Sequence, residues 1–79
     1  MKLSKLAHEG DLLILRDSNN QDIFVVKVDI VRESSIKTYD IYPNRSSSRD
    51  NLTDDYGWQL LAKASSLSEL QALYPQYFI

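Results

Sequence analysis

The chain has 79 residues and no cysteine, and its nine basic and eleven acidic side chains give a net charge of −2. A chain of this length forms one domain with a small core, and without cysteine it has neither a disulfide nor a thiolate metal site to support that core. Because the two signs are interspersed, no segment supplies the concentrated basic face of a duplex nucleic-acid binder or the basic amphipathic helix of a membrane-surface protein.

The N-terminal segment does not resemble a targeting sequence. Its longest apolar run, residues 12–15, is too short for the core of a signal peptide, and no stretch approaches the roughly 20 apolar residues that cross a bilayer. We therefore expect a cytoplasmic protein without a membrane partner. Residues 2–10 fit either a short helix that is capped by Gly10 or an edge strand, and their pattern leaves both alternatives open.

Three segments predict an antiparallel meander joined by short polar turns. Residues 11–17 form a short apolar run between charges, which is typical of a buried strand. Residues 22–32 alternate with period two, and the apolar positions expected on one face are Phe24, Val26, Val28 and Ile30. Residues 36–43 form the third run, which ends at Pro43 because proline cannot donate to a strand ladder.

The C-terminal part predicts one helix and leaves one segment in dispute. Ser66 and Glu69 form a capping box that opens an apolar-periodic run, and Pro75 closes it. Residues 57–63 fit a strand with Trp58, Leu60 and Ala62 on one face, or a helix, and Gly57 favours the strand. The sequence therefore predicts an α+β domain over residues 1–79, with a mainly antiparallel four-stranded sheet and one C-terminal helix.

A polar segment, residues 44–55, contains Leu52 as its single apolar residue. Connections of this length are either simple crossovers or segments that bind something. Arginine, tyrosine and tryptophan are favoured at interface hot spots, and this region supplies all three, so the candidate partner-binding residues are Arg45, Arg49, Tyr56 and Trp58. The apolar C-terminus, Tyr77, Phe78 and Ile79, either closes the core, which we favour, or joins an interface.

The residues that could carry chemistry do not form a known catalytic pattern. His8 is the single histidine, and no nucleophile elbow surrounds any serine. Asp50, Asp54 and Asp55 lack the spacing of a calcium loop, and no glycine-rich phosphate loop is present. We therefore predict no catalytic residue, no metal ligand and no cofactor, and a chain that is not an enzyme.

By elimination, the sequence predicts a protein-interaction module, such as a small adaptor, inhibitor or regulatory subunit. Its partner would be another protein or a second copy of the chain in a homodimer. It would act through a sheet face or edge together with residues 44–58. The alternative is a single-stranded nucleic-acid (RNA) binder, in which bases stack on aromatic side chains of the sheet beside basic ones. The residues of this alternative site are Lys37, Tyr39, Tyr42 and Arg49.

Overall fold

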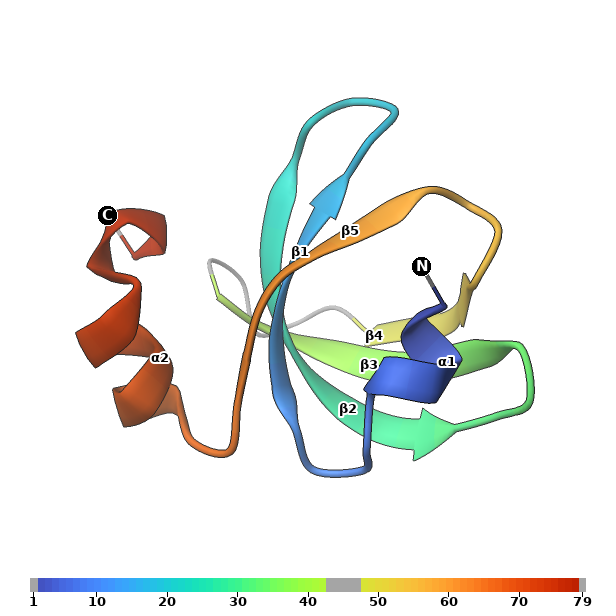
Figure 1. The fold of residues 1–79 in the computed structure, drawn as a ribbon, viewed down its shortest axis with the longest axis horizontal. Helices are drawn as coiled ribbons and strands as arrows, with labels where there is room; N and C mark the ends of the chain where they lie inside the picture. The colour runs from blue at the N-terminus through green and yellow to red at the C-terminus, as the bar shows by residue number, and fades with distance from the viewer. Residues whose placement is uncertain (1, 43–47, 79) are drawn as a thin grey trace.

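The computed structural model describes residues 2–42 and 48–78, with side chains for all of these except residues 48–51. Within them lies one antiparallel sheet of five strands in the order β4-β3-β2-β1-β5 (Figure 1). The first four strands form a meander, and β5 returns to pair with β1. The strands are β1 (Leu12–Asp17), β2 (Ile23–Val31), β3 (Ser35–Tyr42), β4 (Ser48–Thr53) and β5 (Trp58–Ala64). The helices are α1 (Leu3–Leu6), α2 (Leu67–Leu73) and the 3-10 helix η1 (Pro75–Tyr77).

The sheet is apolar on both faces, and a different helix covers each one (Figure 1). The α1 cluster consists of Leu3, Ala7, Leu13, Leu15, Val26, Val28, Ile36 and Leu52. The α2 cluster consists of Leu12, Ile14, Val25, Ala62, Ala64 and Leu70. Successive residues of β1 alternate between the two clusters, which explains why that strand reads as an unbroken apolar run.

The C-terminal helix forms as its capping box predicts. The Ser66 hydroxyl accepts a hydrogen bond from the Glu69 backbone N–H at 3.2 Å, and the Glu69 carboxylate accepts one from the backbone N–H of Ser65 at 3.2 Å. After α2 the chain turns through Pro75, and Tyr77 and Phe78 are half-buried against the α2 cluster. Phe78 and Tyr42 bring their ring centroids to 5.2 Å. The described C-terminus therefore packs on the core, while Ile79 lies outside the described residues.

The sheet has one strand more than the predicted four, and the fold has one α-helix, α1, in addition to the predicted C-terminal helix. The additional strand, β4, occupies half of the segment that we predicted to be a loop over residues 44–55. As an edge strand it needs few apolar residues, and Leu52, opposite Ile36, is the one that enters the α1 cluster. The N-terminal ambiguity resolves as helix α1, which ends before Ala7, so Gly10 lies in the turn that leads to β1 rather than at a cap.

Register shifts also correct two predicted faces. Ile30 does not share a face with Phe24 and Val28, because the pairing with β3 skips Asp29; Ile30 is exposed, and Val31 packs on the α1 cluster instead. Along β5 the pairing with β1 skips Leu61. Trp58 and Leu60 therefore pack on the α1 cluster, whereas Ala62 belongs to the α2 cluster. The disputed segment is nevertheless a strand, as favoured.

Candidate functional site

Three aromatic side chains meet where β5 begins. Trp58 is half-buried, packs on the α1 cluster and contacts the Phe24 ring edge-on, with the ring centroids 6.4 Å apart. Trp58 also contacts the ring of Tyr56, and the centroids of these two rings are 5.1 Å apart. Tyr56 remains 46% exposed. The three rings, called the aromatic cluster below, thus run from the core to the surface.

Two turns that are distant in sequence hold this cluster in place. They are the β1–β2 turn, residues 18–22, and the β4–β5 turn, residues 54–57. The Tyr56 hydroxyl donates to the Asp17 carboxylate at 3.2 Å, and the Ser18 hydroxyl donates to the Gly57 carbonyl. Asp17 is 6% exposed, and its other carboxylate oxygen accepts from the Asn19 backbone N–H at 2.9 Å. The buried carboxylate therefore has partners for both of its oxygens.

The structure brings together only part of the predicted partner-binding set. Tyr56 and Trp58 are neighbours in the aromatic cluster, as described above. Arg45 lies outside the described residues. Arg49 lies in β4 opposite Thr38, but its side chain is outside the described part of the structure. Sequence reasoning missed Phe24 and Asp17, whose contributions depend on contacts across the sheet that no local pattern reveals.

The alternative set divides between two environments. Tyr39 is 40% exposed and lies opposite Lys27 in the β2–β3 ladder, while the Lys37 ammonium lies 3.8 Å from the Asp29 carboxylate. Tyr42, in contrast, packs against Phe78 and the α2 cluster. Tyr39 also lines a hollow of about 400 Å³, together with Lys27, Asp40, Ile41 and Leu67. Tyr39 is therefore open to solvent, whereas Tyr42 is half-buried against Phe78.

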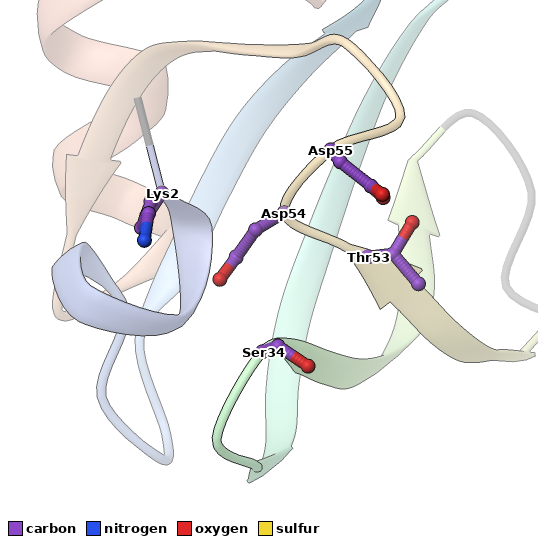
Figure 2. Close-up of a pocket in the computed structure, with 5 residues that line it drawn as sticks. All are labelled: Lys2, Ser34, Thr53, Asp54 and Asp55. Atoms are coloured by element: carbon purple, nitrogen blue, oxygen red, sulfur yellow. The ribbon is translucent and has the colours of Figure 1, made fainter.

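A second hollow, of about 480 Å³, opens between α1 and the β4–β5 turn, and Lys2, Ser34, Thr53, Asp54 and Asp55 line it. Figure 2 shows that Asp54 points toward α1, whereas Asp55 leaves the turn in a different direction. The backbone N–H and the hydroxyl of Ser4 donate to the two carboxylate oxygens of Asp54 at 2.9 and 2.5 Å. Asp54 therefore fastens the turn to α1 and helps to fix the start of β5.

These contacts change the acidity of Asp54. Partial desolvation raises the pKa of its carboxyl, but the hydrogen bonds from Ser4 and the nearby charges of Lys2 and Lys5 outweigh this effect, so the pKa lies below its ordinary value. A carboxyl whose pKa is lowered by folding stabilises the folded state above the pKa of the unfolded chain. That contribution is lost as the pH falls through the lower, folded-state pKa.

We expect Asp54→Asn to reduce the acid sensitivity of the fold. The wild-type free energy of unfolding should decrease below about pH 4, and the variant should lack about 0.5 kcal/mol of that decrease, after allowance for the partial exposure of the carboxyl to solvent. Urea unfolding at a series of pH values measures the difference. Asp55→Asn is the matched control, because Asp55 accepts no hydrogen bond from Ser4; an equal change in both variants would contradict the assignment.

His8 and the acidic side chains are the remaining candidates for chemistry. His8 is exposed, with Nδ1 3.6 Å from the Asp11 carboxylate. Among residues 2–42 and 48–78, no three His, Asp or Glu side chains gather in a group that could hold a metal ion. The side chain of Asp50 lies outside the described residues, so its predicted grouping with Asp54 and Asp55 is not described.

No protein-family model, curated protein or solved structure matches the chain. In the described part of the chain, none of the helices has the length and apolar character needed to cross a membrane.

Proposed function

We propose that the protein is a non-enzymatic interaction module of the cytoplasm, an adaptor, inhibitor or regulatory subunit that binds another protein through the aromatic cluster. One observation carries the proposal: the partly exposed Tyr56 ring is held by Trp58 on one side and by the Asp17 carboxylate at its hydroxyl. A solvent-exposed loop tyrosine would ordinarily keep its rotamer freedom, and losing that freedom on binding costs about 0.5–1.5 kcal/mol.

The position of Tyr56 and Trp58 supports an interface. Large aromatic side chains supply most of the binding energy at protein interfaces when they are rigid and lie at the centre of the contact. Here the inner ring, Trp58, is anchored in the α1 cluster, and the outer ring is available to a partner. The polar edge strand β4 leads directly into this turn, so a partner could contact the turn and the sheet edge together.

Site-specific photocrosslinking tests the proposal. A photoreactive phenylalanine derivative in place of Tyr56 should give a discrete protein adduct in cells that express the chain, and the adduct should survive nuclease treatment. The same replacement at Tyr39 is the matched control, because Tyr39 has a similar exposure of 40% but lies on the face of Lys27. A nuclease-sensitive adduct at Tyr39, with none at Tyr56, would overturn the proposal and favour the nucleic-acid alternative.

A further inference from the structure

A half-buried lysine of β2 has no partner within the described residues. The ammonium of Lys27 forms neither an ion pair nor a hydrogen bond there, although its side chain is partly withdrawn from water. Lys37, in contrast, lies 3.8 Å from the Asp29 carboxylate, and Lys63 lies 3.8 Å from that of Asp11. Because partial desolvation of a charge costs free energy that a partner normally offsets, Lys27 is a cation that an external anion would stabilise.

Lys27 lines the hollow of about 400 Å³ described above, called the Tyr39 hollow below, together with Tyr39, Asp40, Ile41 and Leu67. Lys27 and Tyr39 are directly opposite each other in the β2–β3 ladder, so their side chains leave the same face of the sheet as neighbours. Ile41 and Leu67 pack against the α2 cluster and form an apolar wall. The hollow thus combines one cation, one exposed aromatic ring and an apolar wall.

The carboxylates near the hollow do not neutralise Lys27. Asp40 lies opposite Val26, which packs in the α1 cluster, so the Asp40 side chain belongs to the other face of the sheet, where it is 5% exposed. Asp29 is engaged by another lysine, and the Glu69 carboxylate of α2 accepts a backbone hydrogen bond at the start of that helix. The positive charge in the hollow is therefore not cancelled by the chain itself.

We infer that the Tyr39 hollow binds a small aromatic carboxylate. The ring of the ligand stacks on Tyr39 beside the apolar wall, and its carboxylate accepts a charge-assisted hydrogen bond from Lys27. A single lysine balances a single negative charge, which favours a carboxylate over a doubly charged phosphate. A mainly apolar hollow of this volume with one placed charge is typical of a small-molecule site. The inference goes beyond the proposed function, because Trp58 packs on the opposite face, in the α1 cluster.

Nuclear magnetic resonance titration tests the assignment with 2-naphthoate as the probe. The backbone amides of residues 27, 39, 41 and 67 should shift saturably. The neutral isostere 2-naphthamide tests the charge, and cyclohexanecarboxylate tests the flat ring. Each should bind about tenfold more weakly, as expected when one charge-assisted hydrogen bond or one ring contact is lost. Equal binding of 2-naphthamide, or no saturable shift with 2-naphthoate, would overturn the inference.

Matched variants tie the binding to the named side chains. Lys27→Met keeps the apolar stem and removes the charge, and should weaken 2-naphthoate binding about tenfold, whereas Lys5→Met removes an exposed charge from α1 and should leave it unchanged. Tyr39→Leu should weaken binding about fivefold, and Tyr56→Leu should not, although the two rings are 40% and 46% exposed. Equal weakening within either pair would contradict the site.

A competing ligand distinguishes a carboxylate site from a nucleotide site. Adenosine monophosphate also joins a flat ring to an anionic group, but it carries a phosphate. It should bind more weakly than 2-naphthoate; tighter binding at the same four amides would overturn the assignment to a carboxylate. Crosslinking at Tyr56 judges the proposed function separately, since the variants of the Tyr39 hollow leave Tyr56 and Trp58 unchanged.

Discussion

Replacing Leu70 with alanine should lower the free energy of unfolding by about 3 kcal/mol. Leu70 is 0% exposed and is the one residue of α2 that is fully buried in the α2 cluster. The substitution removes its side chain from contact with the sheet and leaves a cavity beneath a helix of only seven residues. Such a short helix has little intrinsic stability, so its attachment to the sheet depends on this contact.

The loss should be visible in two signals at once. Urea unfolding followed by circular dichroism reports the whole fold, and the fluorescence of Trp58 reports the opposite face of the sheet, where Trp58 packs on the α1 cluster. Both should shift to lower urea together if the domain unfolds as one unit. Leu73→Ala is the control, since Leu73 lies in the same helix but is 62% exposed, and it should change stability by less than about 0.5 kcal/mol. Similar losses in the two variants would contradict the packing described for α2.

Two kinds of element could be predicted from local sequence: a strand in which apolar and polar residues alternate, and a helix that begins with a capping box. β2 follows from its period-two run of branched residues, and α2 follows from Ser66 and Glu69, because these signals act between neighbours in the chain. β4 could not be predicted in this way. Leu52 can be recognised as the core residue of β4 only when β3 lies beside the strand and Ile36 is opposite Leu52.

Register shifts and long-range hydrogen bonds explain the other differences. The shifts at Asp29 and Leu61 each change which residues face a given side, and a strict alternation cannot anticipate them. In the candidate site, residue type alone identified Tyr56 and Trp58. Their arrangement depends on Asp17, which is 39 residues away from Tyr56 and reads in the sequence as an ordinary charge at a strand end.

Gly57 is the residue on which the geometry of the candidate site depends, and we expect Gly57→Ala to lower the free energy of unfolding by about 2–3 kcal/mol. Gly57 has φ +103°, a backbone conformation that side chains rarely adopt. An added Cβ would also lie 2.6 Å from the Ser18 Oγ, too close for the two atoms to keep their places. The Ser18 hydroxyl would then have to rotate away, so the variant should also lose the hydrogen bond from Ser18 to the Gly57 carbonyl that joins the β1–β2 and β4–β5 turns.

Backbone strain and steric overlap can be measured separately with two further variants. Gly10 has φ +90° and nothing within 4 Å of an added Cβ, so Gly10→Ala reports strain alone and should cost about 1 kcal/mol less than Gly57→Ala. In a Ser18→Ala background the overlap at Gly57 disappears, because the Ser18 Cβ is 4.0 Å away, and Gly57→Ala should become about 1 kcal/mol less costly. Urea unfolding of the four members of this cycle gives the coupling energy. A value of zero would mean that Ser18 does not hold the turn, and that the strained backbone of Gly57 fixes the position of Tyr56 by itself.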